Sequence, residues 1–177
     1  MAPQIVFLGM GSNLGDRHHM LQQALDALRA LPETTILACS RIYETEPWGG
    51  VAQGAFHNCA VEIRTTLQPM QLLTAVKNIE REMGRVEVQR NGPRLIDIDI
   101  LLFGDIVMKQ EGLAIPHPAM AERPFVLIPL REIAPDAVHP TEKLTIEELA
   151  LRCGDHGVVD TGIELTVASG EAPDRRD

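Results

Sequence analysis

The chain has 177 residues, of which 45% are apolar and 23% are charged, and its formal net charge is −9. This length and composition indicate a single globular domain with a full hydrophobic core. The acidic balance argues against a nucleic-acid partner, and the lack of a long apolar run argues against a membrane span.

The N-terminal and cysteine patterns indicate the cytoplasm. The first residues lack the charged region followed by an apolar region that marks a secretory signal, so we expect a cytoplasmic protein. Cys39, Cys59 and Cys153 show no Cys-x-x-Cys spacing, which argues against a zinc site and a disulfide framework. We expect a monomer with no membrane or nucleic-acid partner.

Apolar periodicity predicts six main elements in the order strand, helix, strand, strand, helix, strand. They cover residues 4–10, 16–31, 34–43, 56–65, 69–83 and 95–102. This order is typical of a ferredoxin-like α+β core, an antiparallel sheet with helices packed on one face. A C-terminal extension follows, with a short apolar segment at residues 125–130 and a short helix near residues 146–152. We assign one domain to residues 1–160 and a tail to residues 161–177, the last part of which we expect to be disordered.

Two carboxylates mark the last strand of this core. Asp97 and Asp99 are two positions apart, so their side chains point to the same face of the strand. Two ionised carboxylates at this spacing repel by roughly 2 to 3 kcal/mol at an effective dielectric of about 20, so a cation is expected between them. Oxygen ligands favour one or two Mg²⁺ ions that share their coordination with nucleotide phosphates. The aliphatic residues of the other face are expected to face the core: Ile96, Ile98, Ile100 and Leu102.

Basic residues before this strand strengthen the interpretation. An isolated Asp-x-Asp is more often a solvated polar face, but here Pro93 holds Arg94 rigidly beside the aspartates, and Arg90 lies just before it. The planar fork of arginine matches phosphate oxygens. Arg85, earlier in the same loop, is equally compatible with a solvated basic surface.

Early glycines invite a dinucleotide-binding interpretation, which the spacing does not support. Gly9, Gly11 and Gly15 follow a strand and precede a helix, but the third glycine comes one residue late for Gly-x-Gly-x-x-Gly. That motif also needs a parallel sheet, whereas the hairpin-like strands that follow favour an antiparallel one. We therefore expect a tight strand-to-helix turn at residues 11–15 with an architectural role next to the site.

A second informative block combines aromatic and amide side chains. Phe56 and Asn58 share a strand face, so one could stack on a flat heteroaromatic ring while the other reads its edge. Taken alone, this pattern is more often plain core. Trp48, the only tryptophan, lies in a glycine-rich loop, where it is difficult to explain as a core residue.

Three segments carry motifs that occur together in one enzyme family. The segment from Arg90 to Leu101 reads as a basic residue, x-Gly-Pro-Arg-x-x-Asp-aliphatic-Asp and two aliphatic residues. The segment from Thr45 to Asn58 contains Thr-x-Pro-x-Gly and Gln-x-x-Phe-x-Asn, and the third segment has Pro-His at Pro116, followed by Arg-x-Phe at Arg123. Together they resemble the 6-hydroxymethyl-7,8-dihydropterin pyrophosphokinases of folate biosynthesis, in which the block at residues 45–58 corresponds to the pterin-binding segment. The resemblance extends from about residue 5 to residue 140.

The resemblance implies an enzyme that transfers diphosphate from ATP to 6-hydroxymethyl-7,8-dihydropterin and leaves AMP. Two Mg²⁺ ions arriving with ATP would bind the metal ligands Asp97 and Asp99. The expected pterin-binding residues are Thr45, Trp48, Phe56, Asn58 and Phe125. The expected ATP-binding residues are Arg85, Arg90, Arg94, His117 and Arg123. Arg85, Arg94 and His117 would act in catalysis, although for a lone histidine such as His117 the sequence by itself gives no preference between structural and catalytic roles.

Three positions depart from the family, and two other functions stay open. Asn91 stands where the family often has an aromatic residue near the pterin, and Gly112 and Ala114 stand where some members have a basic and a hydroxyl residue near the nucleotide. One alternative is a nucleotide-sensing module without turnover, which would not need both aspartates beside three arginines. The other is a dinucleotide-dependent oxidoreductase, in which cofactor binding would survive replacement of Asp97.

Overall fold

The computed structural model describes residues 1–46, 54–84 and 95–167. Eight strands, four α-helices and one short 3₁₀ helix lie in these ranges. In chain order they are β1 Gln4–Ser12, α1 Arg17–Arg29, β2 Thr34–Cys39, β3 Tyr43–Thr45, β4 Phe56–Thr65, α2 Pro69–Glu82, β5 Asp97–Phe103, β6 Met108–Gln110, β7 Leu113–Ile115, η1 Met120–Glu122, α3 Pro124–Ile133, α4 Ile146–Cys153 and β8 Val158–Asp160.

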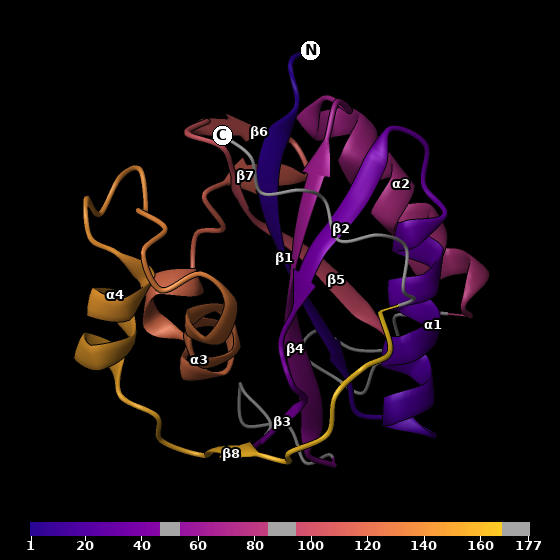
Figure 1. The fold of residues 1–177 in the computed structure, drawn as a ribbon, viewed down its shortest axis with the longest axis vertical. Helices are drawn as coiled ribbons and strands as arrows, with labels where there is room; N and C mark the ends of the chain where they lie inside the picture. Colours follow the sequence, from indigo (N-terminus) through magenta and orange to yellow (C-terminus); the bar gives the residue numbers. More distant parts are fainter. Residues whose placement is uncertain (47–53, 85–94, 168–177) are drawn as a thin grey trace.

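An antiparallel sheet of six strands forms the centre of the fold (Figure 1). Its order is β5-β1-β4-β3-β8, and β2 also pairs with β4. The central strand β1 runs antiparallel to both neighbours, β4 and β5. This confirms the predicted antiparallel sheet, and a doubly wound dinucleotide fold would require parallel neighbours. Strands β6 and β7 form a separate small hairpin.

The first two helices begin where the sequence predicts. The Asp16 side chain caps α1 by accepting a hydrogen bond of 3.0 Å from the His19 backbone N–H, which satisfies a donor that the helix leaves free. Pro69 occupies the first turn of α2, and the chain turns at Gly84 with a positive φ of 86°. Both helices therefore follow from local sequence.

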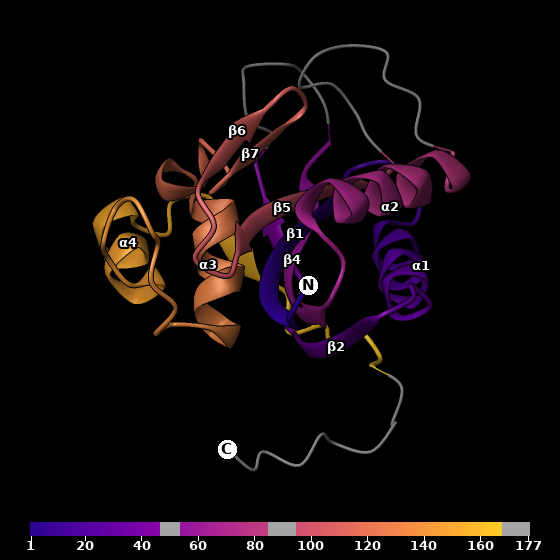
Figure 2. The same cartoon turned by 90° about the horizontal axis from the view of Figure 1, so that it is seen from above.

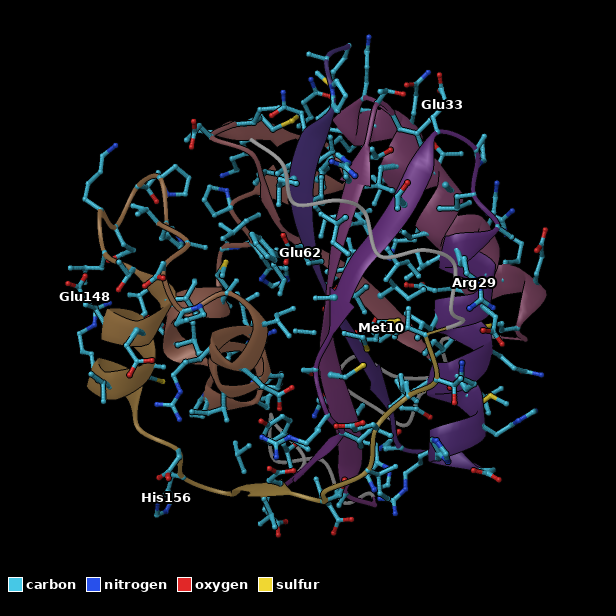
Figure 3. All side chains as sticks on the ribbon, viewed as in Figure 1. Met10, Arg29, Glu33, Glu62, Glu148 and His156 are labelled. Carbon is cyan, nitrogen blue, oxygen red and sulfur yellow. The ribbon has the colours of Figure 1, made fainter. Side chains whose placement is uncertain are left out.

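Helices cover both faces of the sheet, which extends the prediction of helices on one face. As expected, α1 and α2 pack on one face, around Leu8, Val61 and Ile98. The opposite face packs on α3 and α4 through Phe7 and Leu127. Figure 2 shows the two helix pairs on either side of the sheet, and Figure 3 shows side chains filling both layers. The C-terminal extension thus supplies a whole layer of the domain.

Strand breaks and bulges account for the local differences from the sequence prediction. The strand predicted at residues 34–43 is broken at Ser40, whose hydroxyl accepts a hydrogen bond of 2.9 Å from the Ala60 N–H. The Ala60 N–H thus binds a side-chain hydroxyl at Ser40 instead of a backbone carbonyl of the strand. In β5, the register shifts opposite Phe7 and Leu8, so Leu102 joins the α3/α4 core instead of the α1/α2 core. Residues 11 and 12 continue β1, where a turn was expected.

None of the helices in the described part of the chain is both long and apolar enough to cross a bilayer.

Candidate active site

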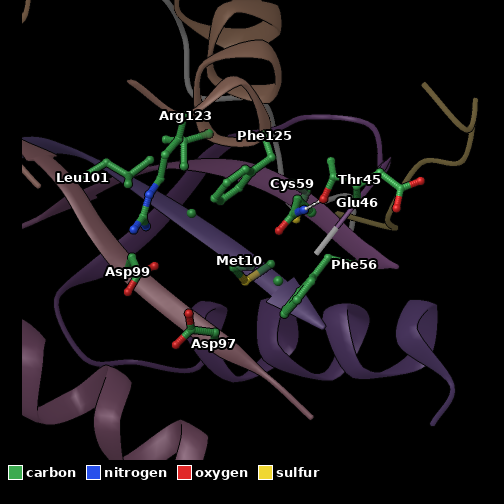
Figure 4. A pocket seen from close by; sticks show the side chains of 14 residues that line it. Met10, Thr45, Glu46, Phe56, Cys59, Asp97, Asp99, Leu101, Arg123 and Phe125 are labelled. Atoms are coloured by element: carbon green, nitrogen blue, oxygen red, sulfur yellow. Dashed lines mark hydrogen bonds between the residues drawn. The ribbon is translucent and has the colours of Figure 1, made fainter. Parts of the chain in front are cut away.

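A cavity of about 130 Å³ lies beside the central strand β1. Its walls come from β1, β3, β4, β5 and the beginning of α3, as Figure 4 shows. On the same measure, one water molecule needs only about 10 to 15 Å³, so the cavity has room for a small organic ring. Acidic and aromatic side chains occupy different ends of it.

The acidic end is formed by β5. Asp97 and Asp99 both line the cavity, which confirms that they share a strand face. Burial, followed by the charge of Asp97, raises the pKa of Asp99 to about 7. Two close carboxylates, one of which resists ionisation, form a donor set that a divalent cation would stabilise.

The two aspartates would leave most of a metal's coordination to other groups. Within the described ranges, no cluster of three or more histidine, cysteine, aspartate or glutamate side chains is placed to hold a metal ion. Mg²⁺ commonly binds proteins through one or two carboxylates and completes its shell with water and substrate phosphates. The residues present fit that mode of binding.

The aromatic end is formed by β4, β3 and α3. Phe56 and Phe125 project toward the cavity from different layers (Figure 4). Between these elements, the Asn58 Nδ2 donates a hydrogen bond of 2.6 Å to the Thr45 Oγ1. Both polar side chains are buried, so their mutual hydrogen bond holds the amide in one orientation. This end can stack a flat ring and read its edge.

Two glycines of β1, Gly9 and Gly11, line the cavity. A Cβ at Gly11 would lie 2.6 Å from the Asn58 Oδ1, which is closer than a real Cβ approaches an oxygen. A Cβ at Gly9 would lie 3.5 Å from the Leu101 side chain, which is an ordinary van der Waals distance. Of the two, Gly11 alone therefore serves the close approach of a side chain across the sheet, and both glycines lie within β1 instead of in a dinucleotide-binding turn.

Arg123 brings a positive charge to the acidic end. Its guanidinium points toward Asp99 (Figure 4) and lowers the pKa of that carboxyl group. The Arg123 Nε is buried without a hydrogen-bond partner, and the guanidinium carbon lies 5.6 Å from the centroid of the Phe125 ring. A buried donor without a partner suits a ligand anion.

His117 lies near this charge cluster but does not line the cavity. Its backbone N–H donates to the Leu101 carbonyl at 2.9 Å. The ring Nδ1 accepts a hydrogen bond from the Ala119 N–H at 3.3 Å, so a neutral ring carries its proton on Nε2. Burial, followed by the charge of Arg123, lowers the pKa of His117, whereas Asp97 raises it.

Comparison with known proteins now identifies the family. The family model described as 7,8-dihydro-6-hydroxymethylpterin-pyrophosphokinase (HPPK) matches residues 7–135.

This chain belongs to the HPPK family.

Whole-length bacterial relatives support this assignment. The 2-amino-4-hydroxy-6-hydroxymethyldihydropteridine pyrophosphokinase of Methylorubrum extorquens is 43% identical over 152 residues, which cover 86% of this chain and 95% of that protein. The protein of the same name from Pseudomonas aeruginosa is 41% identical and is covered to 95%.

Other relatives are much longer. The folic acid synthesis protein FOL1 of Dictyostelium discoideum is 44% identical over 86% of this chain, but the match spans only 23% of that protein. A crystal structure of Plasmodium falciparum HPPK-DHPS, a triple mutant with STZ-DHP, superposes with a TM-score of 0.69 at 19% identity. The superposition covers 85% of this chain and 43% of the Plasmodium falciparum chain. At that identity the likeness shows the fold alone, an α+β arrangement with an antiparallel sheet.

Next to the acidic end of the cavity lies a buried acid that the sequence interpretation missed. The Glu80 side chain is only 1% exposed, and its Oε1 accepts a hydrogen bond of 3.0 Å from the Ile98 N–H. The Glu80 Oε2 lies 3.5 Å from the Lys77 Nζ. Glu80 therefore holds the outer edge of β5 between the two aspartates. A signal was present, because Glu80 continues the buried stripe of α2 four residues after Val76.

Several predicted HPPK residues lie outside the described residues: Trp48, Arg85, Arg90, Asn91 and Arg94. Of the other departures from the family, Gly112 forms the turn between β6 and β7 with a positive φ of 83°. That backbone conformation favours glycine over the polar residue found in some members. Ala114 follows in β7.

Proposed function

We propose that this chain transfers a diphosphate group from ATP to 6-hydroxymethyl-7,8-dihydropterin, producing AMP and the pterin diphosphate. One observation carries the proposal: a single cavity in an HPPK-family chain is lined by paired carboxylates at one end and by a hydrogen-bonded amide and two aromatic rings at the other. The names of the relatives place such proteins in folic acid synthesis.

At the acidic end, Asp97 and Asp99 would hold two Mg²⁺ ions that arrive with ATP. These ions would supply charge neutralisation along the triphosphate. Support comes from the raised pKa of Asp99, because a bound cation removes the repulsion between the two carboxylates.

Around the triphosphate, a set of basic groups would bind phosphate oxygens and neutralise the charge that develops as the bond between the α and β phosphates breaks. The set comprises Arg85, Arg90, Arg94, His117 and Arg123. Of these, the family resemblance assigns Arg85, Arg94 and His117 to catalysis. The buried, unpaired Nε of Arg123 supports its role. Such transfers depend on alignment and electrostatics more than on covalent help from the protein, and we assign no general base.

At the aromatic end, the pterin would lie between Phe56 and Phe125, with Trp48 covering it. The amide of Asn58 and the strand that carries Thr45 would read the polar edge of the ring. The hydrogen bond between the Asn58 and Thr45 side chains supports this assignment, because it orients the amide before any ligand binds.

We further assign the β1–β5 core to the ferredoxin-like class, on the basis of its order of strands and helices. We extend the pyrophosphokinase domain from residue 160 to residue 167, because Leu165 packs in the α1/α2 core. A monomeric, cytoplasmic enzyme without a nucleic-acid or membrane partner stays our expectation.

The test is AMP formation by the purified protein with ATP, MgCl₂ and 6-hydroxymethyl-7,8-dihydropterin. We expect AMP only when both pterin and metal are present. Folded protein that binds ATP without forming AMP would refute the enzymatic proposal and would favour a nucleotide-binding module. Reduction or oxidation of NAD(P) that survives Asp97→Ala would favour the oxidoreductase alternative.

A further inference from the structure

A segment at the end of the described chain crosses the molecule beside the pterin end of the site. We call residues 158–167 the C-terminal strap. The strap lies outside residues 7–135, which the family model matches. In Figure 1 a short connection from α4 leads into it, and it then runs along β3 to the side of the sheet covered by α1.

The strap completes the hydrogen bonding of the strand that carries Thr45. Its first part, β8, pairs antiparallel with β3, and Val158 lies opposite Thr45 in the register. Just before β3, the Ile42 N–H donates to the Ile163 carbonyl at 2.8 Å, and the Thr161 Oγ1 donates to the Ile42 carbonyl at 2.6 Å. Since β3 has only three residues, the strap supplies a large share of its backbone partners.

The far end of the strap is fixed to the first helix. Leu165 is only 7% exposed and packs into the core between the sheet and α1. The Gln22 side chain binds the strap backbone in both directions, donating to the Thr166 carbonyl at 2.9 Å and accepting from the Thr166 N–H at 2.8 Å. The burial of Leu165 is the main anchor of this end, and the two hydrogen bonds of Gln22, which are exposed, fix the position of the strap backbone along α1.

A charged network connects the strap to the helix that carries Phe125. The Arg41 guanidinium lies 3.1 Å from the Asp160 carboxylate of the strap and 2.8 Å from the Glu132 carboxylate of α3. Glu132 also accepts a hydrogen bond of 2.7 Å from the Tyr43 hydroxyl of β3. The strap, β3 and α3 therefore meet in one set of contacts.

We infer that the C-terminal strap is a positioning element for pterin binding, which acts through β3 to hold Thr45 against Asn58. This inference rests on the proposed function. The order β5-β1-β4-β3-β8 places the strap at one edge of the sheet and the two aspartates at the other. Loosening the strap should therefore weaken the pterin half of the site and leave the Mg²⁺ and nucleotide half unchanged.

Two full-length variants loosen the strap at different points. Leu165→Ser removes the buried anchor, and Thr161→Val removes the hydroxyl that binds Ile42 with little change in side-chain volume. Leu165→Met is the conservative rescue variant. Val159→Ser is the matched control, because Val159 lies in the strap but is 63% exposed.

The assays are the KM for pterin, the KM for ATP, kcat, and hydrogen exchange of the β3 amides. We expect the pterin KM to rise about fivefold or more in the first two variants, the scale of one lost oriented hydrogen bond. The ATP KM should stay unchanged and the β3 amides should exchange faster, with both effects absent in Leu165→Met and Val159→Ser. Unchanged pterin KM in folded Leu165→Ser and Thr161→Val, or equal rises in both KM values, would overturn the inference. Absence of wild-type turnover would instead refute the proposed function, and direct pterin binding to the same variants would then decide the strap's role.

Discussion

Replacing Asp99 by asparagine tests the electrostatics of the site without touching its shape. In the protein without metal, burial and the charge of Asp97 raise the pKa of Asp99 from its ordinary value of 3.8 to about 7. A carboxyl group whose pKa is raised on folding stabilises the folded state fully at low pH. It loses that contribution as pH rises through the folded-state pKa. The metal-free wild type should therefore lose stability with rising pH, and Asp99→Asn should not share this loss.

The magnitude follows from the size of the pKa change. Each pKa unit corresponds to about 1.4 kcal/mol, so the full effect between pH 3.8 and pH 7 is about 4 kcal/mol. About 2 to 3 kcal/mol of this falls between pH 5 and pH 8. This is an upper limit, because the Asp99 side chain is only partly buried and solvent screens part of the repulsion.

The assay is urea unfolding of wild type and Asp99→Asn at pH 5 and pH 8, in the presence of a chelator. Between pH 5 and pH 8, the free energy of unfolding of the variant minus that of the wild type should increase by up to about 2 to 3 kcal/mol. Asp105→Asn, on an exposed residue with the same charge change, should show no such trend. Mg²⁺ with a nonhydrolysable ATP analogue should stabilise the wild type at pH 8 more than the variant. If the difference in unfolding free energy between the variant and the wild type did not change with pH, the electrostatic argument would be refuted.

Substitutions at three further positions test the rest of the site and its surroundings. Gly11→Ala should displace the Asn58 amide and raise the pterin KM about tenfold or more, since a single misplaced buried amide costs about 1 to 3 kcal/mol. A pterin KM within twofold of the wild-type value in steady-state assays would contradict this prediction. Arg123→Met should lower kcat about a hundredfold, the usual scale for one lost charge-stabilising donor. Arg123→Lys should recover only part of the lost activity, and single-turnover AMP formation measures the rate of each variant. Full recovery by lysine would show that the arginine fork is unnecessary. Glu80→Ala should destabilise the fold by about 1 to 3 kcal/mol in urea unfolding by leaving a buried N–H of β5 unpaired. Glu80→Gln should restore most of that loss, whereas the exposed Glu82→Ala should have little effect.

Features set by neighbours in sequence could be predicted before the structure. The strand periodicity placed Asp97 and Asp99 on a shared face of one strand and Phe56 and Asn58 on a shared face of another strand, and both pairs line the cavity. The start of α1 at the Asp16 cap followed from local chemistry in the same way.

Features set by distant contacts could not be predicted in this way. The β5 bulge that turns Leu102 to the α3/α4 core depends on its pairing with β1, and no periodicity reports it. The same holds for Leu165, whose burial depends on α1, far away in the sequence. Glu80 was missed because a glutamate next to an apolar stripe of a helix usually points into solvent. The backbone group that it binds, the Ile98 N–H, lies in another element. Roles assigned to Trp48, Arg85, Arg90 and Arg94 stay predictions.

The missing side chain at Gly11 has a consequence for inhibition. The space that a methyl group at position 11 would occupy is already filled by the Asn58 side-chain carbonyl oxygen. A larger residue therefore cannot replace Gly11 while the Asn58 amide stays in place. A pterin-competitive inhibitor whose ring packs against the β1 backbone and hydrogen-bonds to Asn58 would be difficult to escape by mutation here. A substitution that excluded the drug would also misplace the amide that we propose reads the edge of the pterin, so resistance would have to arise elsewhere in the site.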